Sequence, residues 1–263
     1  MSIRVAVRGL AALSVFLLAA FGNSGAARAQ WQINVAAIDP GTALRAQPEP
    51  DLFGLESVAV ARGEILTKWN RVAAEIAADR DVLRRCREAA ATCPASAQKL
   101  LAVIAEGQAR EGRARIGTIN RAINLAIKPM SDLAQWGVID RWSAPLETLS
   151  SGRGDCEDYA IAKYVALGEA GFSEDKLRLV IVRDLGLGED HAILAVRDSE
   201  KWLLLDNRRL VLVEDGELQR VEPLFALNRD GVREFTPSAI ADVRTAAAAA
   251  PSSLGEADRQ SER

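Results

Sequence analysis

Histidine is nearly absent from this chain: His191 is the only one among 263 residues. Any chemistry that needs an imidazole base must therefore use that residue. Basic tracts are also missing, and lysine and arginine (33) are outnumbered by aspartate and glutamate (36). The chain thus lacks the electrostatic footprint of a nucleic-acid-binding protein, and no nucleic-acid partner is expected. Beyond the N-terminal segment, no run is apolar enough to span a bilayer.

The N-terminal segment has the three parts of a secretory signal. Arg4 and Arg8 form a basic region, residues 10–21 form a short apolar region, and residues 27–29 (Ala-Arg-Ala) resemble a cleavage site. Residues 1–29 are therefore predicted to be a signal peptide. The remaining chain is predicted to be exported and not to span the membrane after processing. An uncleaved N-terminal anchor is the alternative.

Three cysteines are an odd number for an exported protein. Cys86 and Cys93 lie seven residues apart near an expected helix end, where a disulfide could close a helical hairpin. Cys156 then has no partner. An unpaired cysteine in an oxidising compartment indicates a reactive thiol or an intermolecular bridge, and the alternative is a small buried apolar residue.

The order of patterns along the chain predicts an α+β fold. Apolar residues at helical spacing cover 57–90 and, less regularly, 95–127, with glycines that could break the second helix. A third helix begins near Cys156, and β-branched runs predict strands at 176–183, 191–196 and 201–206. Helices followed by consecutive strands predict a helical part (57–170) packed on a mostly antiparallel sheet (176–236). We expect one domain over 30–236 and a disordered tail over 237–263.

Cys156 occupies a position that favours thiol chemistry. Asp155 is a suitable N-cap for the third helix, and Asp158, three residues on, resembles a capping box with aspartate in place of glutamate. Cys156 would then be the first helical residue, at the positive end of the helix dipole, which lowers the pKa of a thiol.

The expected strands place two further groups near this thiol. His191 opens one strand and Asp206 ends the next, so an antiparallel hairpin would bring them within side-chain reach. With Cys156 as nucleophile, His191 as base and Asp206 as the group that orients the imidazole, the three form a candidate catalytic triad. Taken singly, His191 could be a strand-end residue and Asp206 a turn residue.

Residues 154–164 (GDCEDYAIAKY), 190–192 (DHA), 205–207 (LDN) and 142–147 (WSAPLE) resemble the bacterial transglutaminase-like cysteine proteinases. The resemblance implies a papain-like, transglutaminase-like core with Cys156, His191 and Asp206 as the triad. It also implies a periplasmic endopeptidase that cleaves a large surface adhesin near its N-terminus and so controls biofilm release. A cyclic-di-GMP-sensing inner-membrane receptor is the implied regulatory partner.

The resemblance further implies that Asp155 and Glu157 bind calcium. Carboxylates around Cys156 disfavour a thiolate, and a hard dication would offset their charge. The alternative is that Asp155 caps the helix while Glu157 complements its dipole. Two other functions stay open on the sequence alone: an acyl transferase of the transglutaminase type, and a non-catalytic domain that uses its groove to bind a partner.

Overall fold

The computed structural model describes residues 52–236. The expected signal peptide (1–29), the expected tail (237–263) and most of the segment before residue 57 lie outside these described residues. Within 52–236, no helix is both long enough and apolar enough to cross a membrane.

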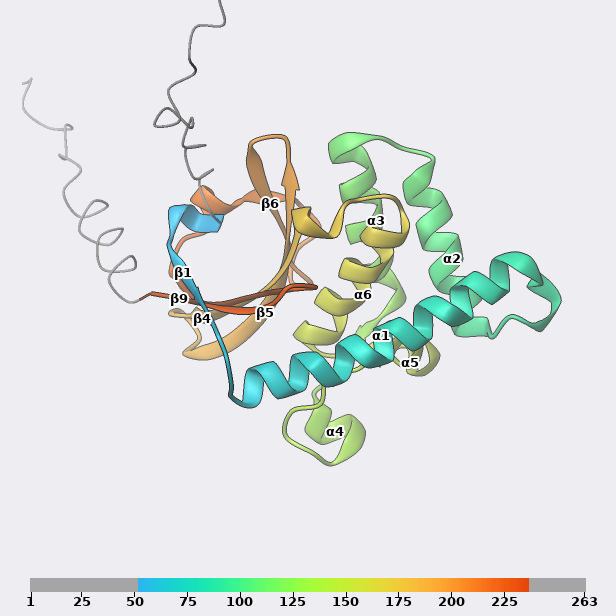
Figure 1. Ribbon diagram of the computed structural model, residues 1–263, viewed down its shortest axis with the longest axis horizontal. Coiled ribbons are helices and arrows are strands. Elements are labelled where there is room, and N and C mark those ends of the chain that lie inside the picture. The colour runs from blue at the N-terminus through green and yellow to red at the C-terminus, as the bar shows by residue number, and fades with distance from the viewer. Residues whose placement is uncertain (1–51, 237–263) are drawn as a thin grey trace, which may run out of the picture. The chain divides into compact units, whose positions relative to one another are not determined.

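An antiparallel sheet of seven strands forms one half of the described region, in the order β1-β9-β8-β4-β5-β6-β7 (Figure 1). The strands are β1 (Ser57–Ala59), β4 (Leu177–Asp184), β5 (Glu189–Asp198), β6 (Lys201–Leu205), β7 (Val213–Glu214), β8 (Val221–Asn228) and β9 (Gly231–Phe235). Two short segments, β2 (Lys128–Pro129) and β3 (Arg153–Gly154), form a separate parallel pair. The sheet confirms the predicted α+β class.

The helices gather on one side of this sheet (Figure 1). They are α1 (Glu64–Glu88), α2 (Ala95–Gln108), α3 (Gly112–Ala126), α4 (Asp132–Trp136), α5 (Pro145–Ser151) and α6 (Cys156–Glu169). α6 lies between the other helices and strands β4 and β5. Every residue of α6 from 157 to 167 is buried, because the sheet covers one face and α2, α3 and α5 cover the others. The helix that begins at Cys156 is therefore the centre of the core.

Two boundaries in the helical part differ from the prediction. The first helix begins at Glu64 and not at residue 57, because Ser57–Ala59 pairs with β9 as an edge strand. The expected helix over 95–127 is two helices, α2 and α3, which pack together after a break at residues 109–111. A Cβ on Gly107 would lie 2.6 Å from the Ile119 side chain, so glycine permits this close packing. Cys86 and Cys93, whose spacing left a disulfide possible, are joined in one.

The start of α6 is not capped as predicted. Asp155 occupies the N-cap position, but its side chain accepts no capping hydrogen bond. Asp158 does not complete a capping box: its Oδ1 accepts a hydrogen bond from the backbone N–H of Ser143 at 2.8 Å. The spacing of Asp155 and Asp158 indicates a capping box, but contacts with residues distant in the sequence replace it.

Candidate active site

His191 and Asp206 form a buried hydrogen-bonded pair. Nε2 of His191 lies 2.9 Å from Oδ1 of Asp206, and the two residues are 4% and 6% exposed. Burial raises the pKa of Asp206, but hydrogen bonds from His191 and from the Arg208 N–H outweigh it, together with the nearby Arg209 charge. The pKa of Asp206 therefore lies below its ordinary value. An ionised Asp206 holds the proton of the imidazole on Nε2 and leaves Nδ1 as the basic nitrogen.

The route to this contact is diagonal and not directly across the hairpin. The β5–β6 ladder pairs Leu194 with Leu205 and ends there. Continuing that register would place Asp206 opposite Ile193, two residues from His191 on the same face, so Asp206 and the imidazole meet as diagonal neighbours. The predicted proximity of His191 and Asp206 is thus observed, as a diagonal contact and not as a directly opposed pair.

Cys156 is a free, partly buried cysteine at the first turn of α6. Its Sγ lies 3.1 Å from Oε2 of Glu157, to which the thiol donates a hydrogen bond. Burial raises the pKa of the thiol, and the charge of Glu157 raises it further, while the backbone N–H of Ala192 acts in the opposite direction. The pKa of the Cys156 thiol is therefore raised, by burial first and by Glu157 second, and is not lowered as its place at the start of the helix predicted.

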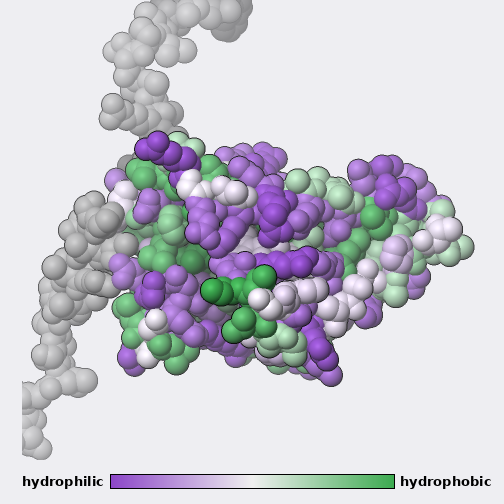
Figure 2. Space-filling model, turned by 90° about the horizontal axis from the view of Figure 1, so that it is seen from below, coloured by the Kyte–Doolittle hydropathy of each residue, from purple (hydrophilic) through white to green (hydrophobic). Residues whose placement is uncertain are grey.

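Cys156 and His191 line the same groove, whose volume is about 810 Å³. Apolar side chains form much of its walls, and charged residues stand among them; its apolar lining includes Val60, Ile65, Ile139, Trp142, Ile181, Leu224 and Phe225. α4 and the loop after it lie beside this groove, on the face seen in Figure 2, where hydrophobic side chains gather among hydrophilic ones. Ile139, 91% exposed, belongs both to that loop and to the groove. Nδ1 of His191 has no hydrogen-bond partner within the described part of the chain.

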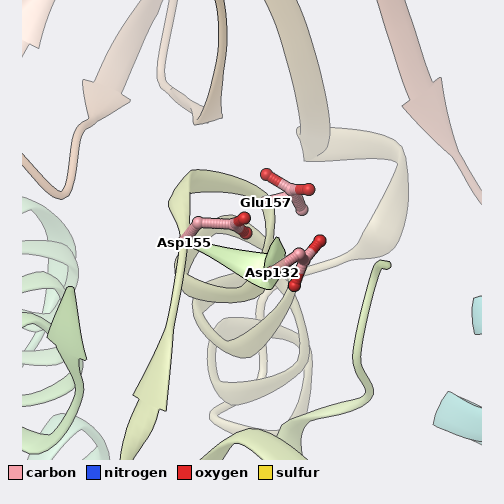
Figure 3. A group of neighbouring side chains, drawn as sticks. All are labelled: Asp132, Asp155 and Glu157. Atoms are coloured by element: carbon pink, nitrogen blue, oxygen red, sulfur yellow. The ribbon is translucent and has the colours of Figure 1, made fainter. Parts of the chain in front are cut away.

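The carboxylates of Asp132, Asp155 and Glu157 converge near the start of α6 (Figure 3). One oxygen each from Asp132, Asp155 and Glu157 lies within 4.8 Å of the others. Asp132 opens α4, Asp155 precedes α6, and Glu157 lies in the first turn of α6. Such a set of oxygen ligands suits a hard divalent cation.

The electrostatics of this acidic cluster (Asp132, Asp155 and Glu157) are unfavourable without a cation. Burial raises the pKa of Asp155 to about 8, and the neighbouring Glu157 and Asp132 carboxylates add to the effect. Burial also raises the pKa values of Asp132 and Glu157. Oδ1 of Asp155 is buried and finds no hydrogen-bond partner among residues 52–236. An unpaired, buried ligand atom inside a cluster of like charges fits a metal site better than a helix cap.

Asp132 is the site residue that sequence analysis missed. The parallel pairing of Lys128–Pro129 with Arg153–Gly154 places the segment before α4 beside the segment before α6. The Met130 N–H bonds to the Gly154 carbonyl at 2.9 Å and extends that pairing toward Asp132. These paired segments are too short to be recognised as strands, so no local pattern could have placed Asp132 beside Asp155.

A buried helix with a free thiol at its first turn, packed on an antiparallel sheet, defines the transglutaminase-like class of α+β folds. The family comparison is more specific. The chain belongs to the bacterial transglutaminase-like cysteine proteinases, since the model of that family matches residues 77–215. A comparison with curated proteins finds no match.

Solved structures with the same fold come from Legionella pneumophila. One LapG structure shares 19% identity with a TM-score of 0.50, and the match covers 63% of this chain and 91% of LapG. Calcium-bound LapG shares 20% identity, again with a TM-score of 0.50, over 59% of this chain and 87% of the other. The EGTA-treated form also shares 20% identity, with a TM-score of 0.50, over 61% and 86%. These similarities support the transglutaminase-like fold.

Proposed function

We propose that this protein is a calcium-dependent cysteine endopeptidase of the periplasm. The observation that carries the proposal is the His191–Asp206 pair at 2.9 Å, whose imidazole shares a groove with the free thiol of Cys156. Membership of a family of cysteine proteinases supports a hydrolytic reaction. A groove with apolar walls and charged residues suits an extended polypeptide, which presents alternating side chains and many backbone groups.

The proposed mechanism assigns one role to each member of the triad. Nδ1 of His191 takes the proton of Cys156, and the thiolate attacks the scissile carbonyl to form a thioester. Asp206 keeps the imidazole in the tautomer and orientation that this transfer needs. The backbone N–H of Cys156, in the first helical turn, is the expected donor to the developing oxyanion. His191 then gives the proton to the leaving amine, and water hydrolyses the thioester.

Calcium is the cation that we assign to Asp132, Asp155 and Glu157. The calcium-bound form of LapG supports this choice, since that protein shares the fold. A bound dication would offset the carboxylate charge beside Cys156 and so favour its thiolate. In its absence, Glu157 accepts the hydrogen bond of the thiol and competes with His191 for that proton.

The substrate and partner follow from the family resemblance. We propose that the substrate is a large surface adhesin, cleaved near its N-terminus, and that cleavage releases the adhesin and disperses biofilm. A cyclic-di-GMP-sensing inner-membrane receptor is the proposed regulator. The signal-like segment at 1–29 supports export to the periplasm, where the protein would encounter the adhesin and the receptor.

Cleavage of an N-terminal adhesin fragment by the purified, exported protein tests the proposal. We expect Cys156→Ala to abolish cleavage while the melting temperature and circular dichroism spectrum stay those of the wild type. Iodoacetamide gives a matched check, because Cys86 and Cys93 are joined in a disulfide and only Cys156 is open to alkylation. Cleavage by the alanine variant at the wild-type rate would refute the assignment.

The same assay separates hydrolysis from acyl transfer. With a primary amine present, an endopeptidase yields two free fragments. Incorporation of the amine in excess of hydrolysis would instead establish a transglutaminase-type reaction. An intact fragment that stays bound to the protein would indicate a groove-binding domain without catalysis.

A further inference from the structure

The backbone that carries Asp206 is held by side chains and not by the sheet. β6 ends at Leu205, and the turn that follows has left the β5 ladder. On the side facing the helices, Nδ2 of Asn124 in α3 donates to the carbonyls of Asp206 at 2.9 Å and of Arg209 at 3.2 Å. One turn earlier on α3, Nδ2 of Asn120 donates to the carbonyl of Leu210 at 3.3 Å.

Lys163 provides the donor from α6. Its Nζ lies 3.4 Å from the carbonyl of Leu205, the last residue of β6. Lys163 follows Cys156 by seven residues, which is two helical turns, so both side chains point toward the sheet from the same face of α6. One helix therefore carries the thiol at its first turn and, two turns on, a contact to the segment that bears Asp206.

A lysine in this position is unusual. Lys163 is 0% exposed, and charged residues are almost never fully buried unless they are paired. The charge that faces it is Asp206, and the titratable Tyr159 ring lies 5.9 Å from Nζ on the same helix. Burial lowers the pKa of Lys163 to about 7, and the Asp206 charge only partly opposes this. Packing alone would favour an apolar side chain, so the buried amine needs another explanation.

We propose that Lys163 is a positioning residue which, with Asn124, holds the turn after β6 so that Asp206 meets His191. This inference rests on the proposed function, because Asp206 is taken as the group that orients the catalytic imidazole. Both residues act through main-chain carbonyls, and neither lines the groove that contains Cys156 and His191. A neutral amine still donates a hydrogen bond, so the contact with Leu205 survives deprotonation of Lys163.

Two substitutions at Lys163 separate positioning from packing. Lys163→Met keeps the length and apolar stem but removes the donor, and Lys163→Gln shortens the side chain but keeps an N–H donor. A packing role ranks the variants by burial, so methionine would be the better replacement in every assay. A positioning role predicts that Lys163→Met melts at or above the wild-type temperature, since buried charges are often replaced by apolar groups without loss.

Activity should follow the opposite order. We expect Lys163→Met to lower kcat/KM for the adhesin fragment roughly 10–100-fold, mostly through kcat, because a small displacement of a catalytic group has effects of this size. Lys163→Gln should recover part of that loss, and Asn124→Ala should also lower kcat. In Lys163→Met, we also expect a change in the rate at which iodoacetamide alkylates Cys156, measured as a function of pH. That profile should no longer show the contribution of the His191 imidazole. Ile161→Val, equally buried on α6, is the control and should leave kcat unchanged.

The outcomes distinguish this inference from the function on which it rests. If the wild type cleaves, Cys156→Ala does not, and Lys163→Met retains the wild-type kcat and pH profile, the positioning role is wrong and the peptidase assignment stands. If methionine exceeds glutamine in activity as well as in stability, Lys163 serves packing alone. If Cys156→Ala cleaves like the wild type, the peptidase assignment itself fails.

Discussion

Buried carboxylates lie beside His191 and beside Cys156, and the fold treats these two sites in opposite ways. Asp206 is surrounded by donors and positive charge, and its pKa is lowered. Asp155 faces other carboxylates, and its pKa is raised to about 8. Burial alone raises the pKa in both cases, so the difference comes from the partners that each carboxylate meets.

The contrast shows which of the two sites has all its counter-charges within this chain. The Asp206 side has its own counter-charges, Arg209 among them at 3.3 Å, and needs nothing further to stay ionised. The acidic cluster has carboxylates facing one another and an unpartnered oxygen on Asp155 in the part of the chain that the structure describes. A cation supplied from solution would complete it.

The largest expected effect comes from neutralising Asp206. Asp206→Asn should lower kcat for the adhesin fragment by roughly 10³–10⁴-fold, because the amide no longer stabilises the imidazolium or fixes its tautomer. Asp198→Asn, at the opposite end of the β5–β6 hairpin, is the control and should retain full activity. A fall of less than tenfold for Asp206→Asn would mean that Asp206 is a turn residue.

A second effect appears in stability as a function of pH. Lys163 has a folded pKa of about 7, below the value near 10.4 in an unfolded chain. Between these pH values the unfolded state binds a proton that the folded state does not, so stability rises with pH across this window. The penalty for burying Lys163 is therefore greatest below pH 7.

Urea denaturation of the wild type and of Lys163→Met at pH 7 and pH 9 measures this penalty. The advantage of the methionine variant should shrink as pH rises, by up to about 1.4 kcal/mol per pH unit. All other titrating groups are shared by the two proteins, so their contributions cancel in the difference. An advantage of equal size at both pH values would contradict a depressed pKa for Lys163.

On the acidic side, calcium should stabilise the fold. We expect added calcium to raise the melting temperature of the wild type, and Asp132→Asn to need roughly 10–100-fold more calcium for the same rise, since affinity depends on the number of charged ligands. Asp140→Asn is the control, because Asp140 lies in the loop after α4 and pairs with Lys68 at 2.5 Å. Equal calcium dependence in both variants would remove Asp132 from the site.

The smallest expected effect concerns the packing around Asp158. A Cβ on Gly154 would lie 2.5 Å from Oδ2 and 2.7 Å from Cβ of Asp158. Gly154→Ala should therefore lower the free energy of unfolding by about 1–3 kcal/mol, the usual cost of overpacking. Gly216→Ala is the matched control, because a Cβ there meets nothing within 4 Å. Equal stability of the two variants would show that the Asp158 side chain moves without cost.

Features that depend on residues close together in the sequence could be predicted, and features that depend on contacts between distant segments could not. Helix α6, strands β4, β5 and β6, and the Cys86–Cys93 disulfide all have local sequence signals. The scarcity of histidine left His191 as the one available imidazole base. Asp132 and the burial of Lys163 depend on contacts between segments distant in the chain, which no local pattern encodes. Asp155 occupies the predicted N-cap position, but its side chain makes no capping hydrogen bond and lies instead beside Asp132 and Glu157.

The enclosure of α6 has a consequence for how this protein tolerates sequence change. From residue 157 to 167, no position of that helix faces solvent, so a substitution anywhere along it changes a contact with the sheet or with another helix. A saturation mutagenesis of the whole chain should therefore find its longest uninterrupted run of intolerant positions here. The sequence of α6 can be recognised in a single chain because packing, and not catalytic chemistry alone, restricts the residue at each position.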